Sequence, residues 1–283
     1  MLKKLLISKE AIKMEIREHK SSFFVYILLR TLVILMMILQ FFNQNYQNVF
    51  LCLLTLILFT VPSIIQVEFK IELPTGLEII ILLFVFCAEI LGEIQSFYLI
   101  IPMWDTVLHT MNGFLAAAIG FSLVDLMNND KRIQFQLSPL YMAIVAFCFS
   151  MTIGVLWEFF EFGMDTIFHL DMQKDTIIHN ISSVALDPTN SNTPIIINGI
   201  QDVIVNGKPL GLGGYLDIGL IDTMIDVIVN FIGAFVFSIF GYIYVKNRGK
   251  GTFVKRFIPH RKDKKRDFKS IIEKRRAKKK SQV

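Results

Sequence analysis

Long apolar runs recur along this chain, separated mostly by short polar segments. Six of these runs approach or exceed the roughly 20 residues that an α-helix needs to cross a bilayer. They cover residues 23–42, 49–66, 76–95, 106–127, 140–162 and 220–245. The pattern therefore predicts an all-α membrane protein in which residues 23–245 form a bundle of six transmembrane helices.

The connection between the last two runs, residues 163–218, is much longer than the others. Its middle alternates β-branched residues with Asn198-Gly199 and Asn206-Gly207, dipeptides that favour tight turns between antiparallel strands. We expect a small extracytoplasmic β-hairpin or loop insertion here. It would either cover a site at the outer mouth of the bundle or have no such role.

The composition agrees with a membrane protein. Hydrophobic residues make up 53% of the 283 residues and charged residues 19%, which excludes an ordinary soluble domain. The first apolar run is too long for a signal peptide and is followed by Asn and Gln instead of a small-residue cleavage pattern, so we expect it to stay in the membrane. Cys52, Cys87 and Cys148 fall inside the predicted spans without metal-type spacing, which favours simple packing residues.

The basic residues predict an orientation, because segments rich in Lys and Arg remain on the cytoplasmic side. The first 20 residues carry six Lys or Arg, and the chain from Lys246 onward carries seventeen. Lys131 and Arg132 lie between the fourth and fifth runs, whereas residues 163–218 contain only Lys174 and Lys208. We expect both termini in the cytoplasm of a cell-membrane protein, which agrees with an even number of crossings.

The two terminal segments are expected to stay at the inner membrane surface. Residues 1–22 predict an amphipathic helix of mixed charge, which would lie along the headgroups or form a solvated cap. Residues 246–283 form a basic tail, and anionic inner-leaflet lipids attract such a tail by about 1 kcal/mol per basic residue. No nucleic-acid partner is expected, because positive-inside anchoring explains the same charges.

Ionisable residues gather in the predicted outer halves of four spans. A charged group near the bilayer centre costs roughly 2.5 to 3.5 kcal/mol and is usually functional. Since no Lys or Arg occupies these half-spans, the acids must be protonated, reach water or bind cations. The group comprises Glu89, Glu93, Asp105, His109, Glu158, Glu161, Asp165, Asp222 and Asp226.

Part of this group has the chemistry of a metal site. Carboxylates with one imidazole and a carboxamide suit Mg²⁺ or Mn²⁺ and tolerate Zn²⁺, so a divalent cation is the cofactor to consider. The candidate ligands are His109, Glu158, Asp226, Glu89 and Asn230. For His109, a structural hydrogen-bonding role is the alternative to metal ligation. Glu93, Asp105, Asp165 and Asp222 sit at the span edges, where the interface is within reach.

Three stretches carry a resemblance: "WDTVLHTMNGF" at 104–114, "LWEFFEFGMD" at 156–165 and "DTMIDVIVNFIGA" at 222–234. Their order resembles the YjdF-like family of polytopic inner-membrane proteins, which is similar in turn to VanZ-like proteins. The resemblance implies a multi-pass membrane protein without an assigned activity and suggests work at the cell envelope. The positions matching the family are Asp105, His109, Gly113, Glu158, Glu161, Asp222, Asp226 and Gly233.

Three functional hypotheses follow. The first is a cation-dependent enzyme at the outer face acting on a lipid or lipid-linked envelope substrate, with Glu161 as general base and His109 and Asp222 as further candidate catalytic residues. The second is a proton- or cation-coupled transporter, which the apolar inner halves of the spans disfavour. The third is a non-catalytic membrane scaffold or envelope-stress protein.

Overall fold

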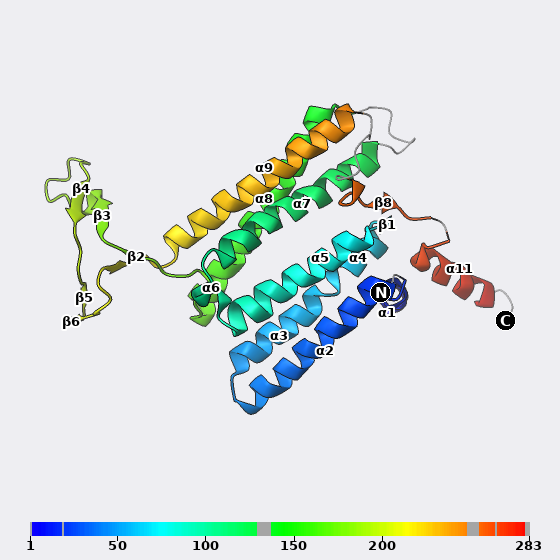
Figure 1. Cartoon of the computed structure of the whole chain (residues 1–283), viewed down its shortest axis with the longest axis horizontal. Coiled ribbons are helices and arrows are strands. Elements are labelled where there is room, and N and C mark those ends of the chain that lie inside the picture. Colours follow the sequence, from blue (N-terminus) through cyan, green and yellow to red (C-terminus); the bar gives the residue numbers. More distant parts are fainter. Residues whose placement is uncertain (1, 19, 129–136, 248–254, 264, 281–283) are drawn as a thin grey trace. The chain divides into compact units, whose positions relative to one another are not determined.

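The structure is a computed structural model that describes residues 2–18, 20–128, 137–247, 255–263 and 265–280 (Figure 1). Lys131, Arg132 and three basic tail residues, Arg248, Lys250 and Lys264, lie outside the described residues. The chain divides into two compact units, one formed by Met1–Met151 with Val229–Val283 and the other by Thr152–Ile228. The division falls within two long helices, α8 (Pro139–Phe168) and α9 (Leu220–Lys246).

The N-terminal half of the first unit is helical. It contains α1 (Leu2–Ile16), α2 (Lys20–Phe42), α3 (Tyr46–Leu58), α4 (Val61–Glu68) and α5 (Thr75–Phe86), which continues without interruption into the π-helix η1 (Cys87–Ile94). Helix α2 packs against α3 and α5 (Figure 1). Their common core is apolar and consists of Tyr26, Leu29, Val33, Cys52, Phe59, Leu82 and Ile90. Because each helix contributes apolar residues from one face to this core, the helices associate along those faces.

The second helical group of this unit follows the short helix α6 (Phe97–Ile100). It comprises α7 (Trp104–Asn128), the first part of α8 and the later part of α9. Helices α7 and α9 approach closely because glycines face backbone: a Cβ on Gly113 would overlap the carbonyl oxygen of Asn230, and one on Gly233 that of Thr110. Such small residues allow helix backbones to meet in membranes.

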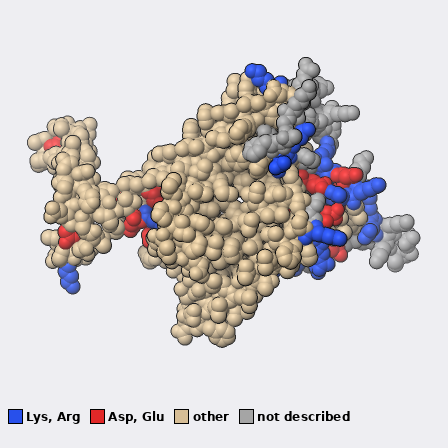
Figure 2. Space-filling view, in the orientation of Figure 1, with Lys and Arg blue, Asp and Glu red and all other residues tan. Residues whose placement is uncertain are grey.

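A cap of terminal segments completes the first unit. Strand β1 (Ile71–Glu72) pairs antiparallel with β8 (His260–Arg261), and α11 (Phe268–Lys280) packs against α1. The apolar contact joins Ile7 and Ala11 to Val67, Phe268 and Ile272. Blue and red side chains gather over these segments in Figure 2. Ion pairs join the segments: Lys262 to Glu15, Arg266 to Glu18 and Glu72, Lys269 to Glu68, and Lys70 to Asp267.

Both terminal segments make contacts that the sequence analysis did not predict. The buried face of α1 lies against protein, and three of the tail's basic residues pair with acids far away in sequence: Lys262, Arg266 and Lys269. Sequence periodicity cannot reveal such pairing, because the partners lie about 200 or more positions apart.

The second unit carries short antiparallel strands. Its strands are β2 (Ile177–Ile178), β3 (Asn180–Ser183), β4 (Ile195–Asn198), β5 (Ile204–Val205), β6 (Lys208–Pro209) and β7 (Tyr215–Leu216), with the 3₁₀-helix η2 (Val184–Leu186) after β3. Asn206 and Gly207, both with positive φ, form the turn between β5 and β6. Strand β4 pairs antiparallel with β3, which precedes it in the chain. Asn198-Gly199 lies at the end of β4 and therefore does not form the turn of this hairpin.

Among the described residues, five helical segments are long and apolar enough to cross a membrane. They are Lys20–Phe42, Tyr46–Glu68, Trp104–Asn128, Pro139–Phe168 and Leu220–Lys246. The remaining expected span, residues 76–95, is divided between α5 and η1 and is not among them. Helix α8 also runs to Phe168, beyond the predicted end at 162.

Candidate metal centre

Three acidic side chains of the second unit come together. Glu158 and Glu161 lie one turn apart on α8, and Asp226 comes from the first turns of α9. One carboxylate oxygen of each lies within 4.8 Å of the others. The three residues are 5%, 7% and 2% exposed, so this is a buried acidic cluster and not a surface patch. We refer to Glu158, Glu161 and Asp226 as the acidic triad.

The triad is electrostatically demanding. Two like charges 4.8 Å apart repel by about 3 kcal/mol at an effective dielectric constant of about 20. Burial adds a desolvation cost to every ionised carboxylate. A divalent cation or shared protons offset both costs, and three carboxylates supply the hard oxygen ligands that Mg²⁺ and Mn²⁺ prefer.

The orientation of Glu161 is set by a neighbour that the sequence analysis did not select. The indole nitrogen Nε1 of Trp157 donates a hydrogen bond of 2.8 Å to Oε1 of Glu161, and Phe160 packs near the indole ring. Trp157 and Glu161 are at i and i+4, so they share one helix face. The sequence signal for this contact is a tryptophan one turn before an acid on an otherwise apolar helix.

Other acids of this unit have backbone partners. Asp165 accepts the backbone N–H groups of Met172 and Gln173, at 2.6 and 2.9 Å. Asp222, a candidate catalytic residue, accepts the N–H of Lys174 at 2.8 Å. Both carboxylates therefore hold the backbone of the segment that follows α8. The spacing of Asp165 and Asp222 in the sequence does not reveal these structural contacts.

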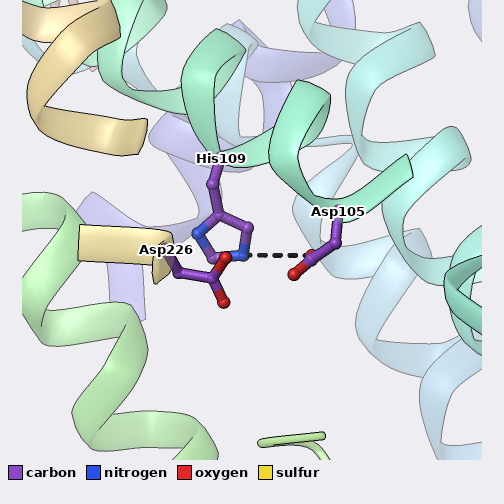
Figure 3. Close-up of side chains that lie close together, drawn as sticks. All are labelled: Asp105, His109 and Asp226. Carbon is purple, nitrogen blue, oxygen red and sulfur yellow. Dashed lines mark ion pairs between the residues drawn. The ribbon is translucent and has the colours of Figure 1, made fainter. Parts of the chain in front are cut away.

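The first unit holds the candidate histidine. His109 and Asp105 lie one turn apart on α7, and their side chains form an ion pair with 3.4 Å between Nε2 and Oδ1 (Figure 3). His109 is 9% exposed. The carboxylate orients the imidazole, as acids do for both ligating and structural histidines. Asp105, which lies at the start of α7, therefore has a partner one turn later on the same helix.

Asn230, another candidate ligand, belongs to a hydrogen-bonded pair. Its Oδ1 accepts a bond of 3.1 Å from Nδ2 of Asn112, and its own Nδ2 lies 3.6 Å from the sulfur of Met151. Asn230 is 1% exposed. The oxygen that would bind a metal is thus used to join α9 to α7, which makes a packing role the direct interpretation of this residue.

Glu89, the remaining candidate ligand, lies in the π-helix η1. It is 3% exposed, and within the described part of the chain its Oε2 has no hydrogen-bond partner. Stretches of π-helix are rare and frequently mark functional positions. Glu89 belongs to the first unit, whereas the acidic triad belongs to the second.

Comparison with known proteins identifies the family. The family described as predicted membrane protein (DUF2238) matches residues 24–247. The match includes all the candidate site residues and all the candidate membrane spans, apart from the first few residues of the span that begins at Lys20. No curated protein and no solved structure gives a significant match. The match covers well over half of the sequence, and the apolar helices agree with it. The chain therefore belongs to the DUF2238 family of membrane proteins.

Proposed function

We propose that this membrane protein is a divalent-cation-dependent enzyme that acts on a lipid or lipid-linked substrate of the cell envelope. The observation that carries the proposal is the acidic triad: three buried carboxylates, contributed by two candidate membrane spans, with oxygens within 4.8 Å. Intramembrane acids of this kind are costly to retain without a function.

The triad residues divide the chemistry between them. Glu158 and Asp226 would hold a divalent cation, and such a cation would supply Lewis-acid polarisation of a phosphoryl or ester oxygen of the substrate and of a water molecule. Glu161, oriented by Trp157, accepts the proton of that water as it attacks. The bond from the attacked atom to the leaving oxygen then breaks, and the leaving oxygen takes up a proton. Mg²⁺ and Mn²⁺ fit the oxygen ligands better than Zn²⁺.

The proposed topology has six crossings with both termini in the cytoplasm. Its support is the packing of α1 against α11, since segments outside the bilayer that contact each other lie on the same side of the membrane. Five crossings would put α1 and α11 on opposite sides. The sixth crossing is the continuous helical stretch 75–94, whose 20 residues would span about 30 Å at α-helical rise. This topology puts the triad near the outer surface.

The resemblance of the three sequence motifs to YjdF-like and VanZ-like proteins supports an envelope substrate. The same topology assigns the basic tail to the inner leaflet, where its basic residues attract anionic lipids. Both assignments are consistent with a multi-pass protein of the cell membrane, and neither depends on the identity of the cation.

The experiment that tests the proposal is a metal measurement on purified protein in lipid nanodiscs. Bound Mn²⁺, counted by electron paramagnetic resonance, should approach one per wild-type chain. Glu158→Gln and Asp226→Asn should each lower the affinity by about tenfold or more, since each removes one charged ligand. Asp165→Asn is the matched control on α8, because Asp165 serves backbone N–H groups.

The outcomes separate the alternatives. A folded wild type that binds neither Mn²⁺ nor competing Mg²⁺ at millimolar supply overturns the enzyme proposal. Proton or cation flux in proteoliposomes that Asp226→Asn abolishes would establish the transporter instead. Loss of folding in both triad variants, without metal binding or flux in the wild type, would leave a scaffold.

A further inference from the structure

A cavity of about 340 Å³ lies among α5, α7 and α9 of the first unit. Ile80 of α5, Met111 and Phe114 of α7 and Val236 of α9 line it. Phe257, from the segment that follows α9, forms a further wall and contacts Phe114 edge to face at 5.2 Å. A size of several hundred Å³ is typical of ligand pockets.

The described residues that line the cavity are almost entirely apolar. Among them, one hydroxyl, that of Thr110, faces the wall, and it donates to the carbonyl oxygen of Thr106 at 2.7 Å within the same helix. The other lining residues present hydrocarbon, a thioether or aromatic rings. An apolar cavity of about 150 Å³ in a soluble protein stays dry and binds small hydrocarbons, so a larger cavity of this kind selects an apolar occupant.

The position of the cavity identifies the source of that occupant. Phe114 and Gly233 lie at or near the middle of α7 and α9, both candidate membrane spans, so the surrounding solvent is acyl chain. Val236 is 39% exposed, which indicates that this wall reaches the protein surface. A lipid chain is therefore the abundant apolar group that can enter from the bilayer.

The residues before Phe257 add a preference for charge. Lys255 and Arg256 directly precede the phenylalanine that closes the cavity, and both are exposed. Basic residues beside a crevice between membrane helices are a recurrent way of holding an anionic headgroup. We propose that the cavity binds one hydrocarbon chain of an anionic phospholipid, whose phosphate is held by Lys255 and Arg256.

The test measures lipids retained by the purified full-length protein after detergent exchange, using native mass spectrometry with phosphatidylglycerol or phosphatidylcholine added. Wild type should retain phosphatidylglycerol. Ile80→Trp and Val236→Trp, which fill the cavity from opposite walls, should reduce retention by about tenfold or more, because each excluded methylene group weakens binding several-fold. Ile232→Trp is the matched control, since Ile232 lies one turn earlier on α9 and is 48% exposed.

The headgroup part of the proposal has its own variants. Replacing Lys255 and Arg256 together by Gln should abolish the preference for phosphatidylglycerol over phosphatidylcholine. The control replaces Lys274 and Arg275, which are exposed on α11 and equally charged. An equal effect of both double variants would overturn the specific headgroup contact in favour of general surface attraction.

A measurement on the wild type guards against variants that misfold. Phosphatidylglycerol with a photoreactive group at the end of one acyl chain should crosslink to the α7 segment containing Met111 and Phe114 in nanodiscs. Unchanged lipid retention in both filling variants, or crosslinks confined to exposed faces such as that of Ile232, would overturn the chain-binding site. None of these results depends on whether the acidic triad binds a cation.

Discussion

Lys262 donates a hydrogen bond to the carboxylate of Glu15, and the side chains are 3% and 1% exposed, although the two residues are 247 positions apart. This buried ion pair joins the N-terminal helix to the segment leading into α11. Removing one member of a buried pair is far more harmful than removing both, because it leaves one buried charge without its partner.

Lys262→Met should therefore destabilise the cap by about 3 to 5 kcal/mol at pH 8, whereas the double variant Glu15→Leu with Lys262→Met should recover most of the loss. Limited proteolysis near residue 262 measures the release of the tail. Lys274→Met, at an exposed position on α11, is the control. Equal protection of wild type and Lys262→Met would contradict a stabilising role of the pair.

The same pair predicts a pH dependence. Burial raises the pKa of Glu15 from 4.5 to about 7, with smaller contributions from Glu78 and Glu18, while Lys262 acts in the opposite direction. Because the folded pKa is the higher one, this group contributes stability that is complete below about pH 4.5 and is lost as the pH rises through about 7. Hydrogen exchange in α1 and α11 should thus slow as the pH falls from 8 to 5, after correction for intrinsic exchange. Glu15→Gln should remove most of this trend.

The contact between α7 and α9 should tolerate no side chain at its glycines. Gly113→Ala and Gly233→Ala place a Cβ against backbone oxygen atoms, which cannot move aside without separating the helices. We expect losses of about 1 to 3 kcal/mol or more in each case. Gly163→Ala on α8 meets no atom within 4 Å and should be neutral or slightly stabilising. Thermal denaturation in detergent makes the comparison, and a Gly163 variant as damaged as the others would refute the packing argument.

Asn230 gives a test that separates packing from metal binding. Asn230→Leu removes the hydrogen bond from Asn112 and should lower stability by about 1 kcal/mol, the scale of polar contacts between membrane helices. The Mn²⁺ affinity should stay within a few-fold of wild type, because the carboxamide oxygen is already used. A loss of Mn²⁺ as large as that of Glu158→Gln would make Asn230 a ligand after all.

Much of the fold follows from apolar periodicity, because helices in a bilayer must satisfy their own backbone hydrogen bonds. The long runs give the candidate spans of α2, α7 and α9 to within a few residues, and they give the start of α8 but not its end at Phe168. The π-helical end of the stretch containing Glu89 was not predictable, since no local pattern distinguishes it from an α-helix. The pairing of β4 with β3 depends on register between distant segments, which a turn dipeptide does not specify.

The sequence names residues of the candidate site but not their contacts. Spacing on α8 puts Glu158 and Glu161 on one face, and Asp226 of α9, also named from the sequence, has a carboxylate oxygen within 4.8 Å of theirs. The sequence proposed Asn230 as a ligand and Asp222 as a catalytic residue, and it could not indicate that Asn230 accepts a hydrogen bond from Asn112 and that Asp222 accepts the N–H of Lys174. Those partners are fixed by tertiary packing and by the loop after α8, neither of which appears in the order of residues along one helix.

The amide pair between Asn112 and Asn230 has a consequence for biosynthesis. The ribosome makes Asn230 118 residues after Asn112, a delay of about 6 to 24 s at usual rates of elongation. Throughout this interval the amide of Asn112 is without the partner that α9 provides in the folded protein. This contact between α7 and α9 can therefore form only after most of the chain has been synthesised.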